Sequence, residues 1–296
     1  MPKAAFVVLA GRPSVGKSTL VNLLCGAKVA IVSAVPQTTR NAVRGILTQP
    51  QGQLVFVDTP GRHMSERKFN KTLMTVADRA LDEAEIVLYL LDASRPAGAE
   101  EEAVAQRLQA FQNRTVAVIN KTDAASPQAL VEFLDKALPD IPPARRFQIS
   151  CLKKEGIQPL LDCLFEMAGE GEIFYPGEYY TDQELSFRVS EIIREKAMTR
   201  LREELPHSIY VEVVDLELRD TDSGKKRLWV RAFIITERES QKGMIVGKGG
   251  EKIKAIGQAA RKELNSILDW AVDLDLRVKT GKDWRHNDRI LKKIMT

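Results

Sequence analysis

The sequence predicts an α/β domain with a mostly parallel, doubly wound sheet, followed by a smaller α+β domain. The first half of the 296-residue chain alternates short apolar runs with longer helical stretches. This alternation favours a parallel sheet with helices on both faces. After Met167 the pattern changes to helix, strand, strand, helix, loop, helix, strand. We therefore expect one domain over 1–168, a linker over 169–182 and a second domain over 183–296.

The apolar runs of the first domain are short and end at glycine or polar residues, as buried strands do. Between them, apolar residues recur at helical spacing, as Leu20, Leu23 and Leu24 do. The predicted strands are 5–10, 54–57, 86–91, 116–119 and 147–149. The predicted helices are 17–26, 69–84, 99–111, 128–138 and 157–167.

A small, acidic and aromatic stretch follows, with Pro176, Gly177 and three tyrosines between 174 and 180. It indicates a linker that aromatic packing partly orders.

The second domain begins with an amphipathic helix over 183–205. Two strand-like segments, 209–218 and 228–235, flank turn residues at 220–224, so we expect an antiparallel hairpin. A short helix, a glycine-rich loop, a helix over 251–268 and a strand over 272–278 complete the predicted order.

The composition is that of a soluble globular protein, with 44% hydrophobic residues, 28% charged residues and a net charge of +4. The stretch 242–262 has six basic residues and one acid, and 277–293 has seven and two. Such clusters match a phosphate backbone, although a solvated helix face is the alternative. The N-terminal residues do not resemble a signal peptide, and no apolar run approaches the roughly 20 residues that span a bilayer.

Three cysteines, Cys25, Cys151 and Cys163, have no metal-ligand spacing. They fit a reducing cytosol.

The most specific motif is G-x-x-x-x-G-K-[ST], which lies between a predicted strand and a predicted helix, the context it requires. Its glycines let backbone N–H groups face phosphates, and the helix N-terminus adds positive charge. Lys17 should reach the β- and γ-phosphates, and the Ser18 hydroxyl should bind Mg²⁺. The motif predicts a nucleoside triphosphate without choosing the base. The expected phosphate-binding residues are Gly11, Arg12, Pro13, Ser14, Val15, Gly16, Lys17, Ser18 and Thr19.

The sequence Asn-Lys-Thr-Asp at 120–123 follows the predicted strand 116–119 and indicates guanine. Asp123 can accept from both N1–H and the exocyclic amine of guanine, whereas adenine has no matching pair of donors. Sites of this kind discriminate by roughly 10⁴ or more. Asn120 should hold the phosphate loop, and the stem of Lys121 should cover the base. Ser150 and Cys151 end the next strand, where their backbone N–H groups would contact the guanine oxygen.

Two loops have the positions of nucleotide switches. Asp58-Thr59-Pro60-Gly61 follows a strand, where the aspartate can hold Mg²⁺ through water and the Gly61 N–H can sense the γ-phosphate. The earlier loop contains Gln37, Thr38, Thr39, Arg40 and Asn41. One of its threonines should close over Mg²⁺ when the γ-phosphate is present, and we favour Thr39.

Arg62 occupies the position of the water-positioning glutamine in Ras-like GTPases, and no glutamine is near. We therefore expect slow intrinsic hydrolysis. Arg62 is either an exposed switch residue, which we favour, or an arginine finger acting in cis. His63 is a weaker candidate for a general base.

In the second domain, the G-x-x-G loop 247–250 lies between two predicted helices. A KH domain uses such a loop to clamp about four nucleotides, and the element order matches the type II KH topology. The alternative is a glycine cap between packed helices. The expected RNA-binding residues are Ile245, Val246, Gly247, Lys248, Gly249, Gly250, Lys252, Ile253 and Lys254.

Basic residues around Trp284 would extend this surface. Trp284 either packs the last helix, which we favour, or stacks on a base.

Together these motifs resemble the Era family of GTPases over nearly the whole chain. The resemblance implies binding to the 3′ end of small-subunit (16S) ribosomal RNA and a role in small-subunit assembly. It also implies a cytoplasmic protein that associates loosely with the inner face of the membrane; we expect a monomer. Ser14 stands where many members carry Asn, an expected K⁺ ligand, so K⁺ is a doubtful cofactor beside Mg²⁺ and GTP or GDP.

Two rival interpretations remain open: a regulatory GTPase whose KH-like domain contacts only proteins, and a metabolic P-loop kinase. In the favoured interpretation, GTP and Mg²⁺ order the Thr39 and Asp58 loops and change the docking of the KH domain, a population shift that controls RNA binding.

Overall fold

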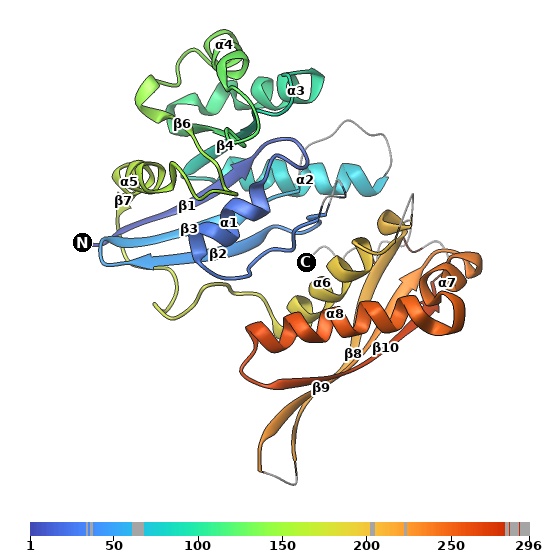
Figure 1. Cartoon of the computed structure of the whole chain (residues 1–296). Helices are drawn as coiled ribbons and strands as arrows, with labels where there is room; N and C mark the ends of the chain where they lie inside the picture. Colours follow the sequence, from blue (N-terminus) through green and yellow to red (C-terminus); the bar gives the residue numbers. More distant parts are fainter. Residues whose placement is uncertain are drawn as a thin grey trace. The chain divides into compact units, whose positions relative to one another are not determined.

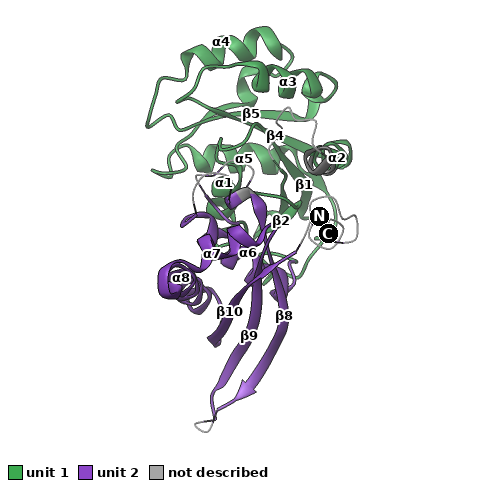
Figure 2. Cartoon of the chain, turned by 90° about the vertical axis from the view of Figure 1, so that its right-hand side faces the viewer, with its two compact units in different colours: residues 1–30, 39–182 green, residues 31–38, 183–296 purple. Residues whose placement is uncertain are grey.

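The computed structural model describes residues 1–33, 35, 38–60, 68–201, 205–221, 224–281, 284 and 290 (Figure 1). These residues form two compact units (Figure 2). Unit 1 comprises residues 1–30 and 39–182, and unit 2 comprises residues 31–38 and 183–296. The expected linker therefore groups with unit 1, while a short piece of the first switch loop groups with unit 2.

A seven-stranded sheet forms the centre of unit 1, with β7 paired to β1 outside the main order β2-β3-β1-β4-β5-β6. The pairs β3–β1, β1–β4, β4–β5 and β5–β6 are parallel. Among the described strands of this sheet, only β2 and β7 run antiparallel to their neighbours. This confirms the expected mostly parallel sheet. The strands are β1 (Lys3–Ala10), β2 (Val43–Gln49), β3 (Gly52–Asp58), β4 (Ile86–Asp92), β5 (Thr115–Asn120), β6 (Arg146–Gln148) and β7 (Gly169–Glu170).

Helices cover both faces of this sheet. Leu81, Leu108 and Leu130 bring α2, α3 and α4 into one buried core with Tyr89 of β4. Helices α1 and α5 lie on the other face (Figure 1). Because the parallel strands all run in the same direction, the loops that follow them lie together at the carboxyl ends of the sheet. The helices are α1 (Lys17–Cys25), α2 (Lys68–Glu83), α3 (Ala99–Leu108), α4 (Gln128–Ala137) and α5 (Ile157–Met167).

The linker is ordered along edge strand β2 rather than extended into solvent. The Ile46 N–H donates to the Tyr180 carbonyl at 3.0 Å. Gln53 of β3 is fully buried, and its side-chain oxygen accepts the N–H groups of Phe174 and Tyr175. Its amide group donates to the Tyr175 carbonyl and the Thr48 hydroxyl. All four bonding positions of the Gln53 amide are thus used.

Unit 2 contains a three-stranded sheet in the order β10-β9-β8. Strands β8 (Ile209–Asp220) and β9 (Lys226–Thr236) form the expected antiparallel hairpin, with a register shift between Val213 and Asp215. Strand β10 (Ala271–Thr280) pairs in parallel with β9.

Helices α6 (Leu185–Met198) and α8 (Glu251–Ile267) pack on this sheet. Helix α7 (Glu239–Val246) and the short turn Lys248–Gly250 precede α8. The core joins Ile193, Val230, Ile256 and Leu264, all fully buried. The order of helices and strands is that of a KH domain, as expected. Among the described residues, no helix is both long and apolar enough to span a membrane.

Candidate functional site

The phosphate loop connects β1 to α1 with backbone geometry that depends on glycine. Gly16 has a φ of +105°, and a Cβ there would lie 2.4 Å from Nδ2 of Asn120. Lys17 is buried, and its ammonium group donates to the Gly11 and Arg12 carbonyls at 2.8 and 3.0 Å. Burial lowers the pKa of Lys17 to about 8, although Asp58 and Glu101 oppose the shift. The lysine is therefore held inside the loop, beside the backbone that would face phosphates.

Three side-chain oxygens meet at the start of α1. The Ser18 hydroxyl donates to Asp58 Oδ2 at 2.6 Å, and the Thr39 hydroxyl lies 3.1 Å from that of Ser18. The Thr39 hydroxyl also donates to Asp58 Oδ2, at 3.3 Å. Asp58 Oδ1 is buried and has no hydrogen-bond partner among the described residues. Hard oxygen donors with a spare buried carboxylate oxygen suit Mg²⁺.

Burial of the Asp58 carboxyl raises its pKa, while the nearby Lys17 charge and the two hydroxyl groups oppose this effect.

Asn120 joins the phosphate loop to the loop after β6. Its Nδ2 donates to the Val15 carbonyl at 2.9 Å, and its Oδ1 accepts the N–H of Cys151 at 3.1 Å. The Asp123 carboxylate accepts the Ser150 hydroxyl at 2.5 Å. Burial raises the pKa of the Cys151 thiol to about 12, which keeps it protonated at neutral pH. Of the five residues expected at a guanine base, four therefore form two hydrogen-bonded pairs, Asn120 with Cys151 and Asp123 with Ser150.

Lys121 has a positive φ of +64° and directs its side chain across the site. Its ammonium group donates to the Ser14 carbonyl at 3.0 Å and to Asp92 Oδ2 at 2.7 Å. Burial raises the pKa of Asp92, but hydrogen bonds from Lys121 and Ser94 outweigh it and hold the pKa below its usual range. Sequence reasoning missed Asp92, although an aspartate directly after a buried strand was a usable signal.

A second missed residue is Glu101 of α3, which lies beside the phosphate loop. Arg12 Nε is 2.9 Å from Glu101 Oε1, and both side chains are almost fully buried. The angles are not those of a hydrogen bond, so the contact is mainly an attraction between charges. Burial raises the pKa of Glu101, and Arg12 opposes the shift.

The two switch loops are partly described. Thr38 and Thr39 point to different partners, because the Thr38 hydroxyl donates to the Val35 carbonyl at 2.6 Å rather than to Asp58. Arg40 and Asn41 are buried. Gln37, Gly61, Arg62 and His63 lie outside the described residues.

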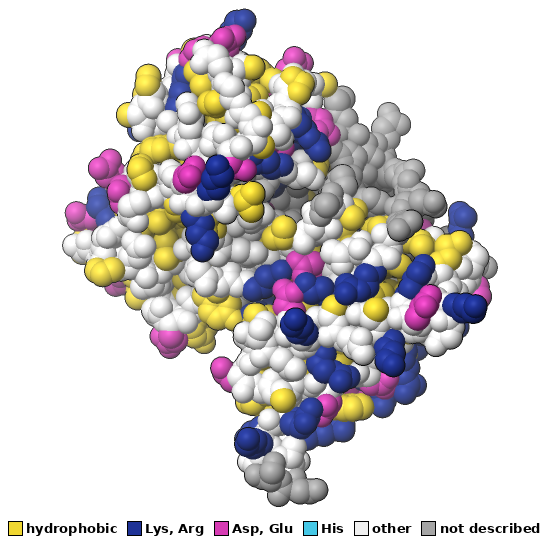
Figure 3. Space-filling view, in the orientation of Figure 1, with side chains coloured by type: hydrophobic (Ala, Val, Ile, Leu, Met, Phe, Trp, Pro, Cys, Tyr) yellow, Lys and Arg dark blue, Asp and Glu magenta, His cyan; other side chains and the backbone are white. Residues whose placement is uncertain are grey.

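The G-x-x-G loop of unit 2 has three glycines with positive φ, at Gly247, Gly249 and Gly250. Lys248, Lys252 and Lys254 are exposed, and Figure 3 shows Lys and Arg side chains gathered over the helices of this unit. Ile245 departs from expectation: it is fully buried in the core, so it supports the loop from beneath instead of lining a groove. Val246 and Ile253 are half-buried.

Trp284 is fully buried, so it packs within unit 2 and does not present its ring to a base. Its indole N–H donates to the Ser208 carbonyl at 3.2 Å, and its ring meets Tyr210 edge-on at 5.0 Å. The basic residues around it, at 282, 285, 289, 292 and 293, lie outside the described residues.

Comparison with known proteins agrees with this geometry. A family described as "50S ribosome-binding GTPase" matches residues 6–121, and one described as "KH domain" matches residues 204–285. GTPase Era of Treponema denticola is 49% identical over 290 residues, covering 97% of this chain and 98% of that protein. GTPase Era of Borreliella burgdorferi is 41% identical, covering 99% of each.

Solved structures extend the likeness over both units. The structure of Era in complex with MgGDPNP and nucleotides 1506–1542 of 16S ribosomal RNA matches with a TM-score of 0.92 at 34% identity, covering 99% of this chain and 98% of that chain. An Aquifex aeolicus Era variant bound to GDP·AlF₄⁻ matches with a TM-score of 0.91 at 34% identity, covering 98% of each.

The fold, the connected loops and these matches define a P-loop GTPase that carries a C-terminal KH domain. The two relatives named above are also similar to this chain over nearly its whole length. The chain belongs to the GTPase Era family.

Proposed function

We propose that this chain binds and hydrolyses GTP in unit 1, binds the 3′ end of 16S ribosomal RNA through unit 2, and so assists small-subunit assembly. The observation that carries the nucleotide assignment is Asn120, which bonds to both the phosphate loop and the loop at Cys151. Base and phosphates would therefore contact one connected set of residues. The exposed lysines of the glycine loop, and the relative solved with 16S RNA, support the RNA assignment.

Each residue of the nucleotide site has a chemical task in this proposal. Asp123 accepts the two guanine donors, and the loop N–H groups with Lys17 bind phosphate oxygens. Ser18, Thr39 and Asp58 would hold Mg²⁺, which neutralises charge on the phosphates when bound. Thr39 lies on the first switch loop, so its contact with Asp58 depends on the conformation of that loop. The position of Thr39 would therefore depend on whether the γ-phosphate is present.

Purine selection tests the nucleotide assignment. In Asp123→Asn the side chain no longer accepts from both N1–H and the amine, so GTP affinity should fall by about 10² or more. The Asn amide donates to the C2 oxygen of xanthine, so the variant should prefer XTP. The measurement is a titration with fluorescent nucleotides, and Asp162→Asn, at an exposed carboxylate on α5, is the matched control. Equal uptake of ATP and GTP by the natural chain contradicts the proposal.

RNA binding is tested with a labelled single strand from the 16S 3′ end. Lys248→Glu should weaken binding and reduce the salt slope by about 0.7 for each phosphate that the variant no longer neutralises. Lys226→Glu, at an exposed position on β9, should change neither. A chain that binds no RNA at low salt favours the rival in which unit 2 contacts proteins.

Hydrolysis is expected to be slow, because Arg62 replaces the usual glutamine. A single-turnover assay of Arg62→Ala separates its two roles: an unchanged rate leaves it an exposed switch residue, and a large loss makes it a finger.

The remaining parts of the proposal concern ions and location. Hydrolysis should proceed at equal rates in KCl and NaCl, because Ser14 replaces the expected Asn ligand. We also propose a cytoplasmic monomer with loose membrane association, tested by analytical sedimentation and by flotation with anionic vesicles.

A further inference from the structure

We propose that Arg194, on helix α6 of unit 2, is a positioning residue for the first switch loop, and that it favours the closed loop that GTP requires. The inference rests on the proposed function, because it takes Thr39 to be the residue that closes over Mg²⁺ and the γ-phosphate.

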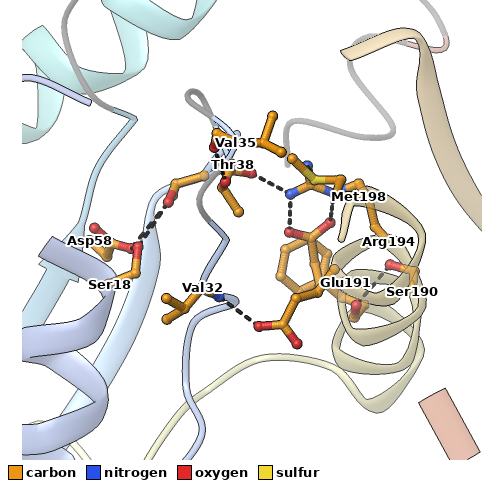
Figure 4. A network of polar contacts seen from close by, with 12 residues as sticks. Ser18, Val32, Val35, Thr38, Asp58, Ser190, Glu191, Arg194 and Met198 are labelled. Atoms are coloured by element: carbon orange, nitrogen blue, oxygen red, sulfur yellow. Dashed lines mark hydrogen bonds and ion pairs between the residues drawn. The ribbon is translucent and has the colours of Figure 1, made fainter. Parts of the chain in front are cut away.

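Arg194 is a buried cation with a fixed orientation. Its side chain is 2% exposed, and its Nε and Nη2 donate to the two carboxylate oxygens of Glu191 at 2.7 and 2.6 Å. Such a two-point pair holds the planar guanidinium rigidly. Nη2 also donates to the Thr38 carbonyl at 2.5 Å (Figure 4). The buried Arg194 guanidinium therefore binds a backbone carbonyl of the first switch loop, that of Thr38.

The next residue of α6 holds the other end of the same loop segment. Glu195 is 3% exposed, and its Oε1 accepts the N–H of Val32 at 2.7 Å. Its Oε2 pairs with Lys196 at 2.7 Å, and Lys196 also pairs with Glu263 of α8. Charged groups on one helix thus bind Val32 and Thr38, near the two ends of segment 31–38, which explains why this segment groups with unit 2.

Segment 31–38 ends at Thr38, and the next residue is Thr39, whose hydroxyl lies with Ser18 and Asp58. Thr38 belongs to unit 2 and Thr39 to unit 1, and consecutive Cα atoms are only about 3.8 Å apart. Fixing the Thr38 carbonyl therefore limits where the Thr39 hydroxyl can lie. In this structure that hydroxyl is beside Ser18 and Asp58 while the Thr38 carbonyl accepts from Arg194.

The charges favour a positioning role over simple packing. Burying a guanidinium is costly, and an apolar side chain would fill the same space at a lower cost. The Arg194 bonds instead give directional control of a carbonyl next to Thr39. GDP lacks the γ-phosphate and does not need Thr39, so Arg194 should matter for GTP and not for GDP. Thermodynamic linkage then requires GTP to strengthen the attachment of segment 31–38 to α6 by the same factor.

The test compares the affinities of GDP and a non-hydrolysable GTP analogue for the full-length chain with Mg²⁺. Arg194→Met should weaken binding of the analogue by about tenfold or more, as expected for loss of a charge-assisted hydrogen bond, and leave GDP binding unchanged. Arg200→Met is the matched control, because Arg200 is exposed and bonds to Lys196 and Thr199 instead of the switch loop. It should change neither affinity.

A second pair of variants covers the case in which Arg194→Met does not fold. Glu191→Gln removes the charge that orients the guanidinium and should lower the analogue-to-GDP affinity ratio. Arg194→Lys keeps a cation at this position and should lower the ratio less than Arg194→Met does. The natural ratio in folded Glu191→Gln, or in folded Arg194→Met, overturns the inference. Equal loss of GDP and analogue binding also overturns it, because the role is then structural. Failure of the unaltered chain to bind guanine nucleotides instead contradicts the proposed function.

Discussion

At the scale of single residues, the buried carboxylate of Glu101 is stabilised by the guanidinium of Arg12 beside the phosphate loop. Arg12→Met leaves the Glu101 carboxylate buried without its paired cation, which typically costs about 3–5 kcal/mol in the free energy of unfolding. The double variant Arg12→Met/Glu101→Leu should recover most of the loss. Urea denaturation of the two variants measures both effects, and an equally unstable double variant contradicts the argument.

The same pair gives a pH dependence whose sign follows from burial. Burial raises the pKa of Glu101, and removal of Arg12 should raise it further. A carboxyl whose folded pKa exceeds its unfolded pKa binds a proton more readily when folded, so stability falls as pH rises through that range. The deficit of Arg12→Met should therefore be smaller at pH 5 than at pH 8. A deficit independent of pH would mean that packing, not charge, is lost.

At the scale of elements, buried strands were the easiest to predict, because β3, β4 and β5 are continuous apolar runs. Edge strand β2 was missed, since Arg44, Thr48 and Gln49 interrupt its apolar residues and Gly45 is unusual in a strand. Helix α6 was predicted to reach residue 205 but ends at Met198, because amphipathic spacing does not mark where backbone bonding stops.

Within the candidate site, motifs with fixed spacing predicted Lys17, Asn120 and Asp123 as site residues. The sequence could not reveal Glu101 or Arg194, because their roles depend on partners far along the chain. Asp92 differs from these two, since its place after a buried strand was visible and was not used.

Gln53 gives a prediction about the linker. Gln53→Leu removes the three hydrogen bonds that the Gln53 side chain makes to the backbone of Phe174 and Tyr175, so the backbone there should open more often. Hydrogen exchange of these two amides should accelerate by about tenfold or more, as expected for loss of roughly 1.5 kcal/mol. Gln51→Leu is the matched control, because the exposed Gln51 side chain bonds only to Gln49 among the described residues. Equal protection in both variants would contradict the anchoring role.

At the scale of the whole molecule, each unit has its own buried core, so the chain should unfold in two calorimetric transitions. GDP at 100 times its Kd should stabilise unit 1 by about 2.7 kcal/mol and leave the transition of unit 2 in place. A GTP analogue should raise both transitions, because closing Thr39 also secures segment 31–38 on α6. A single transition that both nucleotides raise equally would rule out this independence.

The burial of Trp284 has a practical consequence. The chain has three tryptophans, at 229, 270 and 284, and all of them belong to unit 2. Light absorbed at the red edge of the aromatic band therefore excites the RNA-binding half alone, with the indole of Trp284 shielded from water as an internal reference. The protein therefore contains its own optical probe. Unit 1 has no tryptophan, so a shift in the tryptophan emission wavelength on nucleotide addition reports a change that has reached unit 2.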